Sequence, residues 1–87
     1  MLFITPEIYS TKLAAETLNQ DDVRECLKRH FNGDWGEVDK EDWKANEDAL
    51  TGGMRLVSVY TDRNKTRFFV ITEANRSATT ILLPEEY

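Results

Sequence analysis

The chain has 87 residues, of which 40% are hydrophobic and 31% charged, so we expect one small globular domain over residues 1–87 with a thin core, and we exclude a disordered chain. Its single cysteine excludes an internal disulfide, and the lack of a long apolar run or a secretory signal predicts a cytoplasmic protein without membrane association. The formal net charge of −5 argues against general nucleic-acid binding, which needs a basic surface.

The N-terminal residues predict an extended segment and then a short helix. Residues 2–9 are rich in strand-forming side chains, but Pro6 cannot donate a hydrogen bond to a neighbouring strand. We therefore expect an edge strand or an extended arm here. Thr11 can cap a helix over residues 12–18 with its side-chain oxygen.

A second helix is predicted to run to about Phe31, with Asn19 or Asp21 as its cap. Apolar residues recur in it at steps of three and four, and the resulting stripe consists of Val23, Cys26, Leu27, His30 and Phe31. His30 and Cys26 lie one turn apart on this stripe. We expect His30, near the C-terminal end of the helix, to cap the helix or to lie at the edge of the core, and Cys26 to be buried, because a zinc site or a nucleophile pair needs further partners.

The middle of the chain predicts a tight turn and then an acidic third helix. Residues 33–36 form the turn, which carries the large aromatic side chain of Trp35. Asp39 can begin the helix, and Asp42 three positions later resembles a capping box with its acid at the positive end of the helix dipole. The glycine pair at residues 52–53 ends the helix.

Charge is separated along the chain. Residues 34–48 contain seven acids and two bases, whereas the other residues carry nine acids and nine bases. Residues 55–67 are locally basic because Arg55, Arg63, Lys65 and Arg67 outnumber Asp62. This separation is typical either of a surface that guides a partner or of an ordinary solvated helix face, and the acids lack the spacing of a calcium loop.

The C-terminal third predicts three strands. Residues 54–61, 67–73 and 78–83 are rich in β-branched and aromatic side chains and are separated by short polar turns. Consecutive strands with short turns favour an antiparallel meander. The expected fold is therefore α+β, with N-terminal helices packed on a three-stranded antiparallel meander and an N-terminal edge strand as an option.

The hairpin spacing predicts that both faces of this sheet are apolar. If Thr61 pairs with Arg67, one face carries Val57, Val59, Phe69, Ile71 and Leu82, and the other carries Leu56, Tyr60, Phe68, Val70, Ile81 and Leu83. The helices can cover one face. The other, which we take to be the Phe68 face, needs the N-terminal arm, a second copy of the chain as a homodimer, or another partner.

Two stretches carry a resemblance to known proteins. They are Gly33-Asp34-Trp35-Gly36 followed by Glu41, Asp42 and Asn46, and the C-terminal ITEANRSATT at residues 71–80 followed by LLPEEY at 82–87. Over roughly residues 5–87 the chain resembles a family of short uncharacterised bacterial proteins, often encoded on plasmids or other mobile DNA and sometimes labelled plasmid-related or restriction-associated. Members often have aspartate where this chain has Asn75. The resemblance implies no catalytic residue.

We therefore expect a non-enzymatic protein-interaction module, accessory to mobile-element biology, with no cofactor and no metal. The residues expected to contact a protein partner are Trp35, Trp43, Asp39, Asp42, Arg63, Lys65 and Arg67. One alternative is an inhibitor whose acidic segment imitates nucleic acid. Another is a small-molecule enzyme with a site at a dimer seam that uses Glu73, Arg76 and Tyr60.

Overall fold

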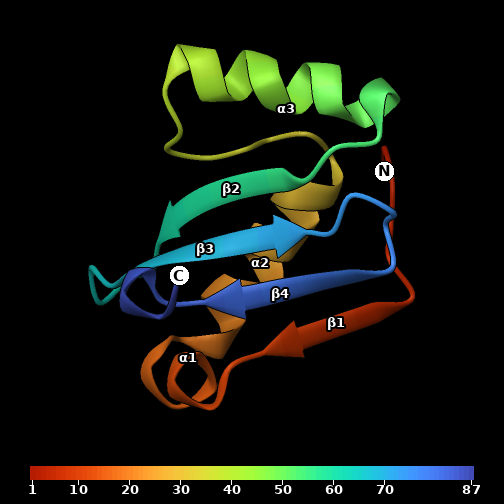
Figure 1. Ribbon diagram of the computed structural model, residues 1–87. Coiled ribbons are helices and arrows are strands. Elements are labelled where there is room, and N and C mark those ends of the chain that lie inside the picture. The colour runs from red at the N-terminus through yellow and green to blue at the C-terminus, as the bar shows by residue number, and fades with distance from the viewer.

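The computed structural model describes residues 1–87 as one four-stranded sheet, three α-helices and a short 3-10 helix (Figure 1). The elements in chain order are β1 (Glu7–Ser10), α1 (Lys12–Thr17), α2 (Gln20–Phe31), α3 (Lys40–Gly52), β2 (Leu56–Thr61), β3 (Arg67–Thr72), β4 (Ala78–Leu82) and η1 (Pro84–Glu86). The strand order across the sheet is β1-β4-β3-β2. The α+β class is as expected.

The sheet is mixed, so the expectation of a three-stranded antiparallel meander is only partly right. Strands β2, β3 and β4 form that meander, and the predicted pairings of Val59 with Phe69 and of Ile71 with Thr80 are confirmed. The N-terminal edge strand that the sequence left as an option is present as β1, directly after Pro6, but it pairs in parallel with β4 and makes the sheet four-stranded. The spacing of strands along the sequence predicts only antiparallel pairs joined by short turns. The parallel pair of β1 and β4 joins residues at opposite ends of the chain.

The helices begin at the capping residues that their sequences predict. The Thr11 side chain accepts a hydrogen bond from the backbone of Ala14, and Asn19, rather than Asp21, caps α2. Asp39 caps α3 by accepting from the Asp42 N–H at 2.8 Å. These caps satisfy N–H groups that have no partner inside the helix.

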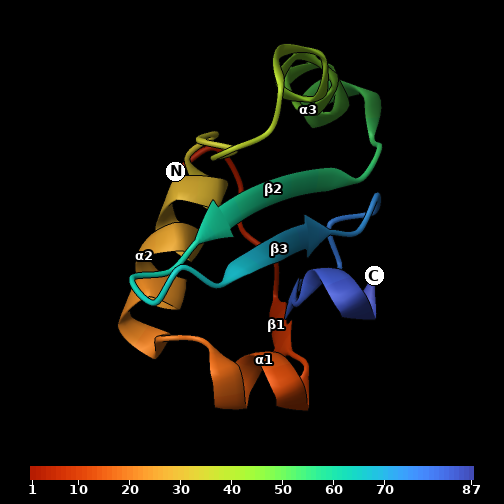
Figure 2. The same ribbon diagram turned by 90° about the vertical axis from the view of Figure 1, so that its left-hand side faces the viewer.

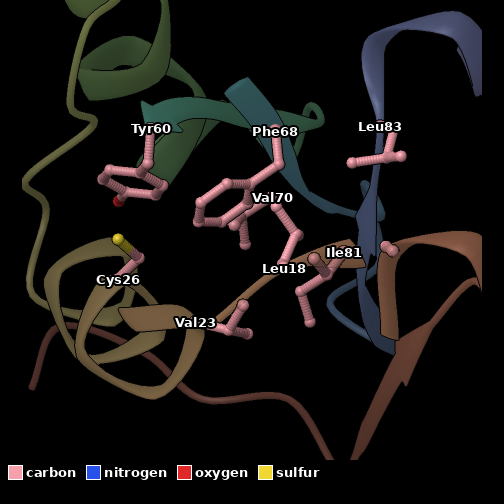
Figure 3. Close-up of a cluster of buried hydrophobic side chains, with 9 residues drawn as sticks. Leu18, Val23, Cys26, Tyr60, Phe68, Val70, Ile81 and Leu83 are labelled. Atoms are coloured by element: carbon pink, nitrogen blue, oxygen red, sulfur yellow. The ribbon is translucent and has the colours of Figure 1, made fainter. Parts of the chain in front are cut away.

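The layers are arranged differently on the two faces of the sheet. Helices α1 and α2 lie against one face, α3 runs beside β2 at the end of the sheet farthest from β1, and η1 lies on the opposite side from α2 (Figures 1 and 2). The main core lies under α1 and α2 (Figure 3), and its buried residues are Ala14, Leu18, Val23, Cys26, Tyr60, Phe68, Val70, Ile81 and Leu83.

The Phe68 face is thus covered by helices of the same chain, which corrects our assignment of the face that needs a cover. The face left partly exposed is the opposite one, where Val57, Val59, Phe69 and Leu82 are only half-buried. Both faces are apolar in sequence, so alternation alone could not show which one the helices would choose. The N-terminal arm does not cover the open face, because Leu2 and Phe3 donate backbone hydrogen bonds to Phe31 at the end of α2.

A chain of buried hydroxyl groups crosses the covered face at His30, which is fully buried rather than at the core edge. Its Nδ1 lies 2.5 Å from Ser58 Oγ and its Nε2 lies 2.8 Å from Thr72 Oγ1. Thr72 Oγ1 is 2.8 Å from Thr79 Oγ1, to which Thr5 donates at 3.0 Å. Burial lowers the pKa of His30 to about 3, so the ring is neutral and both nitrogens are satisfied.

Candidate functional site

The outer edge of β2 is closed by other parts of the chain. Asn46 of α3 donates from Nδ2 to the Val57 carbonyl at 2.8 Å and accepts at Oδ1 from the Val57 N–H at 3.1 Å. Two residues along, the Val59 N–H donates to the Trp35 carbonyl and the Val59 carbonyl accepts from the Glu37 N–H at 2.7 Å. A partner strand therefore cannot add to β2 at these positions.

Changing Asn46 to aspartate tests this closure. Aspartate keeps the acceptor but loses the donor to the Val57 carbonyl and places a charge at a buried position. We expect the free energy of unfolding to fall by about 3 kcal/mol in urea denaturation. The matched control is Asn75→Asp, where aspartate can still accept the Ser77 N–H at an exposed turn, so the change should stay within about 0.5 kcal/mol. Equal stability of the two variants would contradict the closure.

An apolar groove lies on the open face, between α3 and the C-terminal segment. Its volume is about 400 Å³. The residues that line it are Val38, Asp42, Ala45, Asn46, Arg55, Val57, Val59, Phe69 and Tyr87. Val57, Val59 and Phe69 come from adjacent strands β2 and β3 and share one sheet face. The groove thus has a sheet floor, a helical wall and an aromatic wall.

The aromatic wall carries a cation that Tyr87 holds in place. The Tyr87 ring packs edge-to-face on Phe69 with 5.3 Å between centroids, and the Arg55 guanidinium lies 5.8 Å from the Tyr87 ring centre. Arg55 Nη2 also donates to the Tyr87 hydroxyl at 2.5 Å. No carboxylate lies within 4.0 Å of Arg55, so its charge is not neutralised within the chain.

The opposite wall of the groove is acidic. Asp42 lines it directly, and Glu41 precedes Ala45, another lining residue, by one helical turn. Both carboxylates are exposed, and neither forms an ion pair. The groove therefore separates an unpaired negative wall from an unpaired positive one.

Four of the residues predicted to contact a partner lie in or near α3, and their surroundings differ. Trp35 is fully buried with Ala49 and Leu56, so it offers no surface to a partner, and that prediction does not fit the fold. Trp43 is half-buried against the same cluster, and Asp39 is occupied as the cap of α3. Of the four, only Asp42 reaches the groove.

The basic hairpin is largely neutralised. Arg63 forms a paired contact with Asp22 of α2, with Nη2 to Oδ1 at 2.9 Å, and this bond holds the pKa of Asp22 below its usual value. Arg67 lies 3.8 Å from a carboxylate oxygen of Glu37. Lys65 is exposed in the turn without an ion pair. These residues lie outside the groove, so the structure does not join them to Asp42.

The three residues considered for an enzyme at a dimer seam are not brought together. Tyr60 is buried on the covered face and donates its hydroxyl to the Asp34 carbonyl at 2.6 Å. Arg76 donates to four backbone carbonyls, including that of Ala49 at 2.7 Å, and so ties the β3–β4 turn to the end of α3. Glu73 is exposed, and neither surface hollow is lined by any of the three.

A second hollow, of about 300 Å³, lies beside α2 and is mostly polar. Its arginines are paired, since Arg63 contacts Asp22 and Arg29 contacts Asp34. Cys26 lies in its wall, and burial raises the pKa of this thiol, which lowers its reactivity. No three His, Cys, Asp or Glu side chains form a group that could hold a metal ion.

Most of the groove has no signal in the sequence. Arg55 stands out there only by its charge, and Tyr87 only as part of a C-terminal motif. The apolar character of both sheet faces is the available signal, because the helices cover only one face and leave the other in need of a cover.

Comparisons with protein-family models, with curated proteins and with solved structures found no match. None of the helices combines the length and apolar character that crossing a membrane would demand.

Proposed function

We propose that this protein is a non-enzymatic interaction module that binds an apolar, basic segment of a partner protein in the groove between α3 and Tyr87. The observation that carries the proposal is the partly exposed floor of Val57, Val59 and Phe69, which lies between walls of opposite, unpaired charge. Apolar floors with a few charged groups at the rim are typical of binding sites.

Charge supports a basic segment. The chain carries a net charge of −5, Asp42 lines the α3 wall, and Glu41 precedes it on the same helix; neither carboxylate has a cationic partner. A lysine or arginine beside an apolar anchor would meet these carboxylates while the anchor covers the floor. Such complementarity guides encounter and fixes the orientation of the partner.

The chemistry of the lining residues supports binding over catalysis. Histidine, cysteine, serine and threonine do not line the groove, and Asn46 is engaged by the β2 backbone. A covalent mechanism would need a nucleophile next to a base. The groups present are suited to hold a segment in place.

The test is to block the groove with Ala45→Trp and to compare it with Ala15→Trp. Both alanines are exposed on helices, but Ala45 lines the groove and Ala15 lies on α1. Random peptides displayed on phage are selected against the unmodified protein, and their affinities are measured by NMR titration. We expect selected peptides to combine an apolar residue with a basic one and to lose at least about tenfold in affinity with Ala45→Trp only.

Three results would contradict the proposal. The first is the absence of enriched peptides. The second is equal binding to the two tryptophan variants. The third is a concentration-dependent dimer, seen by light scattering, that Ala45→Trp abolishes, because the occupant would then be a second copy of this chain.

A further inference from the structure

The groove offers an occupant very few polar contacts inside it. Both polar atoms of the Asn46 side chain bond to the Val57 backbone, and the Val59 backbone is bonded to the 35–37 turn. An occupant therefore cannot be recognised through a ladder of main-chain hydrogen bonds along β2. Specific polar recognition is left to the rim.

The one cation among the lining residues is Arg55, and it is prepared for an anion. Tyr87 holds the guanidinium by a hydrogen bond from Nη2 and by its ring, whereas no carboxylate of the chain lies within 4.0 Å of it. A guanidinium has five N–H donors and binds a carboxylate through two parallel bonds. The donors not directed at Tyr87 are free for such a contact.

The size of the groove limits how much of a segment can enter. A volume of about 400 Å³ is near the lower end of the range for ligand pockets, so a few apolar groups fill it. The anion on Arg55 must therefore lie close along the chain to the apolar anchor that contacts Val57, Val59 and Phe69.

From these observations we infer that the groove binds the free C-terminus of the partner, with the terminal carboxylate on Arg55 and the last apolar side chain on the sheet floor. This inference rests on the proposed function. In a C-terminal residue the carboxylate and the side chain share one Cα, so both anchors fit the small groove. With an internal acidic residue, the carboxylate on Arg55 and the apolar anchor would belong to two different residues, so more of the chain would have to enter the small groove.

The experiment uses one random peptide library displayed in two formats, with free C-termini and with C-termini extended by a fixed linker. The full chain is the target, and Arg55→Gln is compared with Arg24→Gln. Arg24 is an exposed arginine of α2, away from the groove. The peptide most enriched is then synthesised as the acid and as the C-terminal amide, and each is titrated while the NMR signals of Val57, Val59 and Phe69 are followed.

We expect enrichment only with free C-termini, and an affinity at least about tenfold higher for the acid than for the amide. This preference should disappear in Arg55→Gln and persist in Arg24→Gln. If the two formats enrich peptides equally, or the amide binds as tightly as the acid, the inference is wrong while the proposed function stands. If neither format yields a groove binder, both are wrong.

Discussion

Alanine at position 36 is expected to lower the free energy of unfolding by about 4 kcal/mol. Gly36 has φ of +75°, and a Cβ built on it would lie 2.1 Å from the Val59 carbonyl oxygen and 2.7 Å from the Tyr60 ring. Backbone and a buried ring both resist displacement. The turn would move away from β2, and the hydrogen bonds of Val59 to Trp35 and Glu37 would be lost with it.

Substitutions at two other glycines distinguish the steric clash of a Cβ at position 36 from the cost of a positive φ. Gly53 has a similar φ of +70°, but a Cβ at this position would meet nothing within 4 Å, so Gly53→Ala should cost about 1 kcal/mol. Gly52 ends α3 in open space, and Gly52→Ala should be neutral or stabilise by about 0.5–1 kcal/mol. Urea denaturation of the three variants gives the comparison. Equal losses for Gly36→Ala and Gly53→Ala would contradict the close approach of the turn to β2.

Acidification is expected to destabilise the protein through His30 well before its carboxylates protonate. The pKa of this buried imidazole is lowered from 6.5 to about 3, so below pH 6.5 the unfolded chain binds a proton that the folded chain does not. The contribution of His30 to the free energy of unfolding is therefore fully present only above pH 6.5. It is lost as the pH drops toward 3, at up to about 1.4 kcal/mol per pH unit. The loss between about pH 7 and pH 5 should reach about 2 kcal/mol.

The measurement is urea denaturation across this pH range, with His30→Gln as the comparison. Glutamine cannot titrate, so the free energy of unfolding of the His30→Gln protein should be nearly independent of pH down to about pH 5. Below that, Asp22 and Asp34 add a further loss in both proteins, because bonds from Arg63 and Arg29 hold the pKa of each carboxyl below its usual value. Parallel pH profiles above pH 5 would show that His30 is not the group responsible.

The parts of the fold that could be predicted are those set by neighbours in sequence. The short turn between Thr61 and Arg67 fixes the β2–β3 register, and the capping residues Thr11 and Asp39 mark helix starts by local hydrogen bonds. These features depend on a few consecutive residues. The register of the hairpin and the starts of the helices can therefore be predicted from the sequence.

The parts that could not be predicted depend on contacts between distant residues. Pairing of β1 with β4 joins Glu7 to Ala78, and the closure of β2 depends on Asn46 reaching Val57 from a helix. Neither leaves a periodic signal. The two stretches singled out in the sequence, residues 33–46 and 71–87, contain side chains of this kind, since Asn46 bonds to Val57 and Arg76 bonds to Ala49. These side chains hold the fold together.

The burial of Trp35 could not be predicted, because composition alone placed this residue beside the acids of the middle segment. A large aromatic beside acids is typical of a contact surface, but the turn at residues 33–36 directs this ring inward against Phe3 and His30. The groove is instead lined in part by small or aliphatic side chains such as Ala45 and Val59, which the sequence did not single out as contact residues. They come together only because α3 and the C-terminal segment meet the sheet.

The closed border of β2 also limits how copies of this chain could aggregate. A sheet with two free borders can recruit molecules on both sides and grow into a fibril, whereas here only the β1 border is free. If two molecules joined through β1, each would present its sealed border outward. Edge-to-edge growth would end at a pair.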